Sequence, residues 1–445
     1  MDQLPKGNSK LLNAWAFYDW ANSVYALTIT SAVFPIFYDA LFVENKHTIS
    51  VFGLNLKNSA LISFVTAIAF LIVAICSPIL SGVADYIGNK KTFMKFFCYL
   101  GSFACIGLYG FDLQNIYLGL TFYLLGLIGY WGSLVFYNSY LPDIAYPEQQ
   151  DKISAKGFSY GYIGSVLLLI INLGMIMKPD FFGISGSESE AAMKAMRYSF
   201  VMVGIWWIIF SQYTFYYLPK GNSNHNQKVS KQILFNGFKE LKKVWVLVQA
   251  NLALKRYLGS FFVSSMAVQT VMLVATYFGA QEIAWPTKNE GTIGLIICIL
   301  LIQFLAIIGS QLTAKASSKY GNITTLIAIT SFWILLCLGA FFIKLPFQFY
   351  TMAAFVGLVM GGIQSLSRST YSKLVPETED TASFFSFYDV AEKVGIVIGM
   401  CLYGIIDQLT GSSRLAIVFL AMFFILAVIL LFRIPKTKVL NSYKG

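Results

Sequence analysis

Charged residues are scarce in this chain: Asp, Glu, Lys and Arg together make up only 12% of its 445 residues. A typical soluble domain carries about 25% charged residues. So few charges cannot cover the surface of a soluble protein of this length, and hydrophobic residues make up 57% of the chain. The composition therefore indicates a membrane protein with several spans.

Residue patterns that hold metals or cofactors are also missing. The two histidines, His47 and His225, lie in polar stretches, and the six cysteines lie in apolar stretches without a Cys-x-x-Cys pair. Zinc sites and disulfide frameworks usually show such spacings, and a Gly-rich phosphate-binding loop is absent as well. We therefore expect no metal, no cofactor and no enzymatic activity.

Positive charge exceeds negative charge, which gives a formal net charge of +11. No aromatic-and-basic motif or long basic tail accompanies this excess, so we expect no nucleic-acid partner. Cytoplasmic loops of membrane proteins are enriched in Lys and Arg. With the N-terminus placed in the cytoplasm, 23 of the 32 Lys and Arg fall on the cytoplasmic side. Both termini are therefore predicted to be cytoplasmic.

Stretches without charged residues define twelve predicted spans, since a helix needs roughly 20 apolar residues to cross a bilayer. The first span extends back through Asp19, and the eleventh is shortened by Asp389, Glu392 and Lys393. The first is too long for a signal-peptide core and is expected to stay in the membrane. The charge-free stretches are 20–38, 58–84, 96–111, 113–142, 157–177, 198–219, 257–281, 291–314, 320–343, 345–367, 394–406 and 415–432.

The segment 218–256 in the middle of the chain is polar and basic, with eight Lys and Arg. Apolar residues from Leu234 to Leu252, among them Trp245 and Val248, recur every three or four positions, which predicts an amphipathic helix. We expect a cytoplasmic linker whose helix lies against anionic lipid. The linker separates a predicted N-terminal six-helix bundle, residues 1–217, from a C-terminal one, residues 257–445.

The two halves repeat the same loop motifs in the same order. Residues 82–91 and 316–322 form similar loops 233 residues apart, and Leu-Pro-Asp at 141–143 matches Val-Pro-Glu at 375–377 at an offset of 234. An internal six-plus-six repeat joined by a basic linker is the organisation of major facilitator transporters. The sequence thus predicts an all-α membrane protein of twelve helices in two pseudo-repeated bundles.

The first of these loops resembles the signature loop of the major facilitator superfamily. Gly82, Asp85, Gly88, Lys90 and Lys91 occupy its glycine, acidic and basic positions, although the basic residue that normally follows the aspartate is missing. The resemblance implies a cytoplasmic latch that holds the outward-open state. Asp85 suits this role because a carboxylate is stabilised at the positive end of a neighbouring helix. A simple turn with a cytoplasmic anchor is the alternative.

Four further blocks, at 15–26, 136–144, 153–164 and 361–369, resemble the vacuole-effluxer (autophagy-related 22-like) family of major facilitator transporters. The resemblance implies a secondary transporter that works as a monomer. Eukaryotic members are associated with amino-acid export from the vacuole. The short loops are typical of a prokaryotic member in a bacterial inner membrane. Residues 265–267 depart from the family pattern, because a family carboxylate is absent there.

Ionisable and amide groups inside the spans are the candidates for substrate or proton binding, because such groups are costly in a bilayer. Asp19 shares a helix face with Asn22, and it could carry a proton, bind a substrate ammonium or act structurally. Lys393 could bind a substrate carboxylate, reach Asp19 or pair with Asp389 four residues away. The substrate or proton candidates are Asp19, Asn22, Tyr25, Asn138, Gln269, Gln364 and Lys393.

Residues near the cytoplasmic ends of the spans are the candidates for gating. Arg368 ends a polar run in the tenth span, where it could gate, contact the substrate or extend its guanidinium to the membrane interface. The gating candidates are Gly82, Asp85, Gly88, Lys90, Lys91, Arg368 and Asp389.

We expect an alternating-access transporter of a small polar solute, with an amino acid as the favoured substrate and the proton as a possible coupling ion. A peptide, a cell-wall fragment, a sugar or a lysolipid is the alternative among substrates. A non-transporting receptor or assembly factor on the same fold is the alternative among functions.

Overall fold

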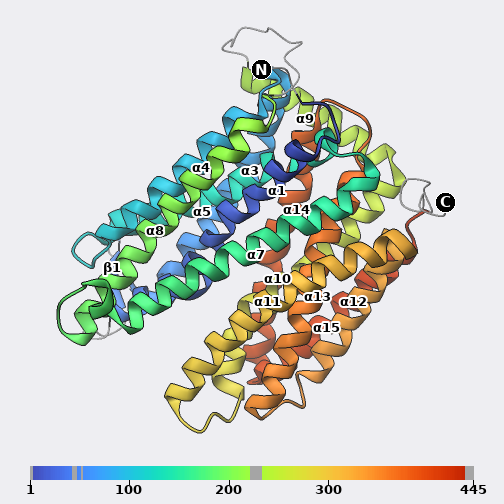
Figure 1. Cartoon of the computed structure of the whole chain (residues 1–445). Helices are drawn as coiled ribbons and strands as arrows, with labels where there is room; N and C mark the ends of the chain where they lie inside the picture. Colours follow the sequence, from blue (N-terminus) through green and yellow to red (C-terminus); the bar gives the residue numbers. More distant parts are fainter. Residues whose placement is uncertain (1–3, 43–47, 52–53, 221–232, 436–445) are drawn as a thin grey trace.

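The computed structural model describes residues 4–42, 48–51, 54–220 and 233–435, and these form helices joined by short loops and one small hairpin (Figure 1). His47, His225 and residues 221–232 of the predicted linker lie outside the described residues. The elements are α1 (Ser9–Val24), η1 (Tyr25–Ala32), α2 (Val33–Ala40), β1 (Thr48–Val51), β2 (Leu54–Lys57), α3 (Asn58–Ile87), α4 (Lys90–Gly107), η2 (Leu108–Gly110), α5 (Ile116–Ser139), α6 (Leu141–Ile144), α7 (Pro147–Met177), η3 (Pro179–Phe182), α8 (Glu188–Tyr217), α9 (Ile233–Ala250), α10 (Leu252–Glu282), α11 (Lys288–Tyr320), α12 (Asn322–Gly339), α13 (Pro346–Leu374), α14 (Thr381–Thr410) and α15 (Ser413–Phe432).

The predicted all-α membrane fold is confirmed, with the antiparallel β1–β2 hairpin as an addition that the sequence did not predict. Within the described residues, eleven helical segments are long and apolar enough to cross a membrane. The remaining predicted span, the eleventh, lies in α14, which is 30 residues long but carries Asp389, Glu392 and Lys393 in its interior. Several helices extend past the predicted stretches, because those stretches were ended at charged residues that the fold in fact buries.

The helices form two groups, which Figure 1 shows as separate bundles. We call α1 to α8 the N-terminal half and α10 to α15 the C-terminal half. The halves approach one another near α9 and diverge toward their opposite ends, so we name these the closed end and the splayed end. The division at residues 217 and 256 stays a prediction.

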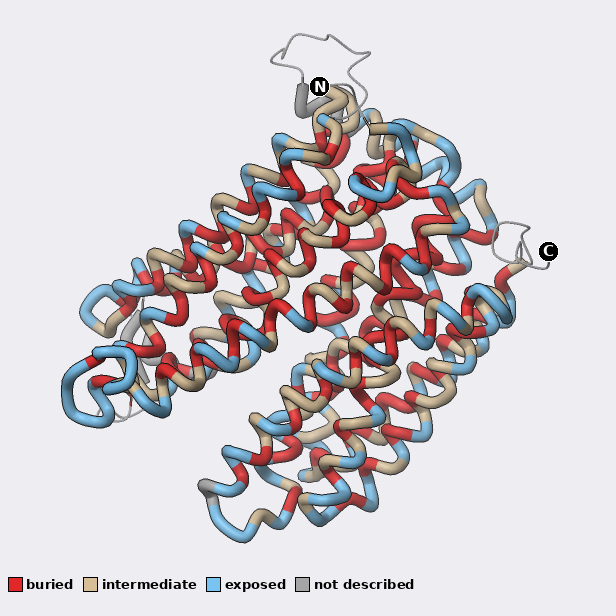
Figure 2. The backbone as a smooth tube through the Cα atoms, viewed as in Figure 1, coloured by how far each residue is buried: buried red, intermediate tan, exposed pale blue. Residues whose placement is uncertain are grey.

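Each half has its own hydrophobic core. The N-terminal core contains Trp15, Tyr137 and Trp207, and the C-terminal core contains Trp333 and Tyr371, all fully buried. Large apolar side chains such as those of α3 and α11 are exposed on the outside of the molecule, as expected of a surface that faces lipid. Figure 2 shows buried positions inside each half and also where the halves approach at the closed end. The contact between halves is therefore part of the interior.

The first span changes helix type midway. α1 begins after Asn8, whose side chain accepts hydrogen bonds from the backbone N–H groups of Lys10 and Leu11. After Val24 the chain continues as the π-helix η1 before α2 resumes the α-helical repeat. π-helical turns are rare and frequently occur at functional sites. This one begins one turn after Asn22, at the end of the helix that carries Asp19.

The helix α9 lies between the halves in sequence and packs at the closed end. Val244 and Val248 are buried, whereas Trp245 and Leu252 are about half exposed although the sequence placed them on one stripe with Val248. The buried face follows the contact of α9 with α3 and α14. Lys243 lies 3.2 Å from Asp380, and this hydrogen bond raises the pKa of the Lys243 ammonium above its ordinary value. Leu234 and Phe238 belong to the same predicted stripe, but their side chains lie outside the described part of the chain.

Candidate functional site

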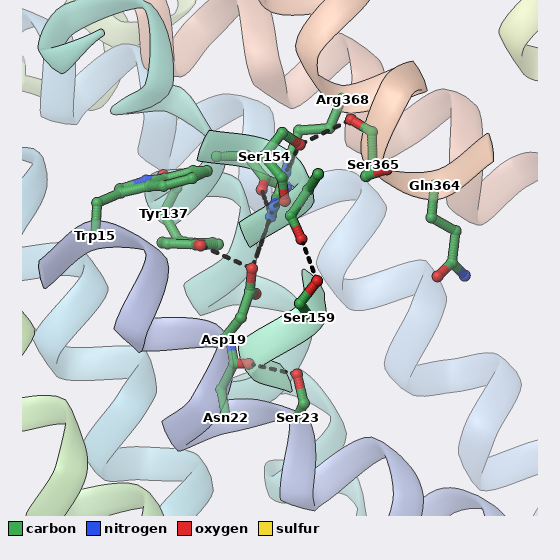
Figure 3. A network of polar contacts seen from close by, with 12 residues as sticks. Trp15, Asp19, Asn22, Ser23, Tyr137, Ser154, Ser159, Gln364, Ser365 and Arg368 are labelled. Carbon is green, nitrogen blue, oxygen red and sulfur yellow. Dashed lines mark hydrogen bonds and ion pairs between the residues drawn. The ribbon is translucent and has the colours of Figure 1, made fainter. Parts of the chain in front are cut away.

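A buried ion pair joins the two halves. Asp19 on α1 and Arg368 on α13 are separated by 349 positions in the sequence, yet both guanidinium Nη atoms lie 3.2 Å from Oδ2 of Asp19. The hydroxyl of Tyr137 also donates a hydrogen bond to the same oxygen, at 2.8 Å. Figure 3 shows the arginine reaching across to Asp19. Only 4% of the Arg368 side chain and 6% of the Asp19 side chain are exposed, so the pair is screened from water.

The remaining donors of Arg368 also bind the N-terminal half. Nε donates to the hydroxyl of Ser154 at 3.0 Å, Nη2 to the carbonyl of Ser154 at 2.9 Å, and Nη1 to the side-chain oxygen of Asn138 at 3.3 Å. Arg368 therefore does not extend to the membrane interface, which was one of the sequence alternatives. The guanidinium stays inside the protein because a matched carboxylate and several acceptors are available there.

Three aromatic rings surround this guanidinium. Its central carbon lies 4.2 Å from the ring centre of Phe158, 4.8 Å from that of Trp15 and 5.4 Å from that of Tyr137. Trp15 and Tyr137 stack on each other, and the indole of Trp15 donates to the backbone carbonyl of Tyr137 at 2.8 Å, which fixes both rings. We call Trp15, Tyr137 and Phe158 the aromatic cage. Rings at these distances attract a cation through their negative faces.

The backbone at Gly157 makes room for the pair. A Cβ atom at this position would lie 2.5 Å from Oδ2 of Asp19 and 3.1 Å from Nη2 of Arg368. Real Cβ atoms do not approach other atoms so closely, so a larger residue would displace the carboxylate or the guanidinium. Glycine at 157 is thus a condition for the ion pair.

A second group of charges lies on α14. Lys393 pairs with Asp389 at 2.7 Å and with Glu392 at 2.9 Å, and its ammonium lies 3.7 Å from the ring centre of Trp131 on α5. Gln269 of α10 donates to Glu392 at 2.9 Å. We call Asp389, Glu392 and Lys393 the α14 charge cluster. Its lysine is paired within its own helix rather than with Asp19, which was the other sequence alternative.

The other substrate candidates occupy separate places. Asn22 is fully buried and accepts a hydrogen bond from the hydroxyl of Ser23 at 3.3 Å. Gln364 accepts from Tyr162 at 2.8 Å and so joins α13 to α7, but its side chain points away from Arg368 (Figure 3). Tyr25 stacks on Tyr130 in the core of the N-terminal half, with ring centres 5.0 Å apart. The structure thus brings Asp19, Asn138 and Arg368 together, and separately Gln269 with Lys393 and Asp389.

The signature loop contacts the C-terminal half at the closed end. Both oxygens of Asp85 accept hydrogen bonds from backbone N–H groups at the start of α14, from Ala382 at 3.2 Å and from Ser383 at 2.7 Å. Lys90 pairs with Asp143 and also donates to Thr381. We call Asp85, Lys90, Asp143 and Thr381 the first latch. Its carboxylate lies where a helix N-terminus favours negative charge.

Three remaining gating candidates support this loop from within the N-terminal half. Gly88 has a φ of 70° and ends α3 in the left-handed conformation that favours glycine. Gly82 is buried inside α3. Lys91 donates to the backbone carbonyl of Leu218 at 2.7 Å, which ties the start of α4 to the end of α8. The fourth, Asp389, accepts from Ser77 of α3 at 3.4 Å and so reaches the other half.

A second latch was missed in the sequence. The ammonium of Lys373, at the end of α13, lies 2.7 Å from Asp151 near the start of α7. Ser317 and Asn322 also donate to this carboxylate, at 2.9 and 3.0 Å, and Asn322 accepts from Lys373 at 3.0 Å. We call these four residues the second latch. Asp151 and Lys373 had been assigned to loops because charge ended the predicted spans there. Their positions beside the repeated loop motifs were the available signal.

Comparison with known proteins identifies the family to which the chain is related. The sequence model of the family described as vacuole effluxer Atg22 like matches residues 7–443. The chain belongs to this family. An uncharacterised MFS-type transporter, YxiO of Bacillus subtilis (strain 168), is 30% identical over 431 residues, which cover 96% of this chain and 95% of that protein. Autophagy-related protein 22-2 of Aspergillus oryzae is 24% identical over 488 residues, covering 90% of this chain and 78% of its own length.

Solved structures show the fold of this Atg22-like chain. The major facilitator superfamily transporter FucP in its outward conformation superposes with a TM-score of 0.70 at 14% identity, and the match covers 96% of this chain and 99% of FucP. The proton:xylose symporter XylE gives a TM-score of 0.68 at 14% identity, covering 98% of both chains. The chain is therefore an integral membrane protein with the major facilitator fold, and the family resemblance found in the sequence is confirmed.

Proposed function

We propose that this protein is a secondary transporter that moves a small polar solute, an amino acid in the favoured case, by alternating access rather than an enzyme. The observation that carries the proposal is the Asp19–Arg368 pair. It places opposite charges from the two halves in contact inside a protein of a transporter family. Relative motion of the halves has to break this pair, so solute binding and motion can be coupled through it.

The favoured substrate follows from the chemistry of the two charged groups. An amino acid carries an ammonium and a carboxylate. The carboxylate of Asp19 matches the first, and Arg368 or Lys393 matches the second. The resemblance to vacuole effluxers supports the same class. A neutral sugar would leave both charged groups without a counterpart, which is costly when they are buried.

We also propose the orientation. The closed end carries the first latch, the second latch and α9, and the positive-inside rule places these basic segments in the cytoplasm. The closed end would then face the cytoplasm, with both termini on that side, and the splayed end would face outward across a bacterial inner membrane. In this orientation the described conformation corresponds to an outward-facing state. We expect the protein to act as a monomer.

The test uses purified protein in liposomes loaded with a labelled mixture of amino acids, with and without a pH gradient. We expect protein-dependent efflux that falls about tenfold or more in Asp19→Asn, the loss expected when a buried charge pair worth about 1.4 kcal/mol or more is broken. Acceleration by the gradient would support proton coupling, and indifference to it would support facilitated transport. Absence of efflux for every amino acid, with protein that remains folded, would overturn the substrate proposal.

A further inference from the structure

Arg368 brings the cation of this site from the C-terminal half, and the described groups that hold its guanidinium belong to the N-terminal half. Asp19 and Trp15 come from α1, Tyr137 and Asn138 from α5, and Ser154 with Phe158 from α7. The N-terminal half therefore contains a complete receptor for one organic cation, made of a carboxylate, three further acceptor atoms on Ser154 and Asn138, and three aromatic faces. Arg368 fills this receptor from outside, as a ligand would.

Separation of the halves at the closed end removes Arg368 together with α13. Asp19 then lacks its cationic partner in a site that Gly157 keeps narrow and the cage lines with aromatic rings. An ionised carboxylate left alone in such a place is costly, and breaking a buried pair commonly costs about 3–5 kcal/mol. A cation from solution that reproduces the hydrogen bonds and the ring contacts of the guanidinium would offset this cost.

We propose that Asp19 and the aromatic cage bind the cationic head group, an ammonium or a guanidinium, of the transported solute, and that Arg368 displaces this group when the closed end joins. The inference rests on the proposed transport function and narrows its substrate class to solutes with an organic cation. Dicarboxylates without such a group, and sugars, are excluded. The α14 charge cluster does not offer the same site, because its own Lys393 already occupies Asp389 and Glu392.

The first experiment removes the internal ligand. Arg368→Ala in lipid nanodiscs should bind methylguanidinium, measured by calorimetry and by a rise in melting temperature. The double variant Asp19→Asn, Arg368→Ala should bind it at least about tenfold more weakly. Arg414→Ala is the matched control, since Arg414 pairs with Glu282 at 2.7 Å in the C-terminal half and, within the part of the chain that the structure describes, lies over a single ring, that of Phe278. Arg368→Gln replaces Arg368→Ala if the latter does not fold.

Absence of methylguanidinium binding to a folded Arg368 variant would overturn the inference. So would equal binding to Arg414→Ala or to the variant that lacks Asp19, because the site would then be unspecific.

The second experiment uses the wild-type protein in liposomes and compares labelled L-arginine, agmatine and L-glutamate. Agmatine carries a guanidinium and an ammonium but no carboxylate. Flux of arginine or agmatine that methylguanidinium inhibits would support the inference. Flux of agmatine without flux of any amino acid would keep the cation site and overturn the amino-acid proposal. Flux of glutamate that neither methylguanidinium nor agmatine inhibits would keep amino-acid transport and overturn the cation site.

Discussion

The two latches at the closed end occupy equivalent places in the repeat but are built from different charges. In the first, the loop carboxylate Asp85 reaches the start of α14 in the other half. At the equivalent position, 233 residues later, stands Ser318, whose hydroxyl donates to the backbone carbonyl of Lys315 one turn earlier in α11. The second latch obtains its carboxylate from Asp151 on the opposite half instead. The repeat thus preserved where the halves touch but not which element supplies the acid: the N-terminal half provides it in both latches, from the end of α3 in the first and from α7 in the second.

The latches also differ in their contact with water. The side chains of Lys373 and Asp151 in the second latch are 1% and 8% exposed, whereas those of Lys90 and Asp143 in the first are 6% and 30% exposed. Buried charges lose more when a partner is removed, because water cannot replace it. The second latch, which has no recognisable motif, should therefore contribute more to holding the halves together than the motif-bearing first latch.

The largest effect is expected from Lys373→Ala. Asp151 would keep two neutral donors, Ser317 and Asn322, but would lose the ammonium of Lys373, at a cost of about 3–5 kcal/mol. We expect a lower melting temperature and faster labelling of a cysteine introduced at buried Ser372 by a membrane-impermeant maleimide. Asp151→Asn combined with Lys373→Met removes both charges and should recover much of the loss. A double variant as damaged as the single one would contradict the ion-pair explanation.

An intermediate effect is expected from Asp85→Ala. The variant leaves two N–H groups at the start of α14 without their acceptor, and loss of such a helix cap costs about 0.5–2 kcal/mol. Asp85→Asn keeps one acceptor oxygen and should lose less. In the same assay, we expect the labelling rate at position 372 to rise less in both variants than in Lys373→Ala. If Asp85→Ala exceeded Lys373→Ala, burial would not be what separates the two latches.

A smaller effect is expected from Lys90→Ala. Its partner Asp143 is partly exposed, so water can solvate the carboxylate once the lysine is gone, and exposed pairs contribute about 0–1 kcal/mol. The melting temperature of Lys90→Ala, measured beside that of Lys373→Ala, compares the two lysines directly. Equal losses would show that the first latch is as shielded from water as the second.

The difference between the latches also explains what the sequence could predict. Hydropathy predicted most of the helices and their order, and four short sequence blocks predicted the family, because each of these signals depends on residues close together in the chain. Charge was used to end the spans, so α13 was ended at 367 and α14 was begun at 394. Asp151 and Lys373 were therefore left outside the predicted spans and were not recognised as site residues. These charged side chains are buried because each has a partner in the other half, and a local sequence pattern does not reveal that partner.

The candidate site was predicted in part for the same reason. Asp19 and Arg368 were each recognised as unusual, because an ionisable group in an apolar helix is costly wherever it lies. Their pairing across 349 positions was not predictable from one sequence. Tyr25 was predicted to bind substrate or a proton because it follows Asp19 and Asn22 in the first span, but its ring belongs to the core of the N-terminal half. Spacing identifies a face of a helix and not the element that packs against it.

The smallest effect is expected from Ser318→Asp, which restores the acidic residue of the motif in the second half. Ser318 is exposed and its hydroxyl bonds within its own turn, so an aspartate there faces solvent near Lys315 and Lys319 rather than the start of α7. Exposed substitutions of this kind usually change stability by no more than about 0.5 kcal/mol. The melting temperature and the Ser372 labelling rate should both stay close to wild type, with Ser318→Asn as the uncharged control. Clear stabilisation by aspartate alone would show that the loop can reach α7, and that the two halves have diverged in sequence but not in latch geometry.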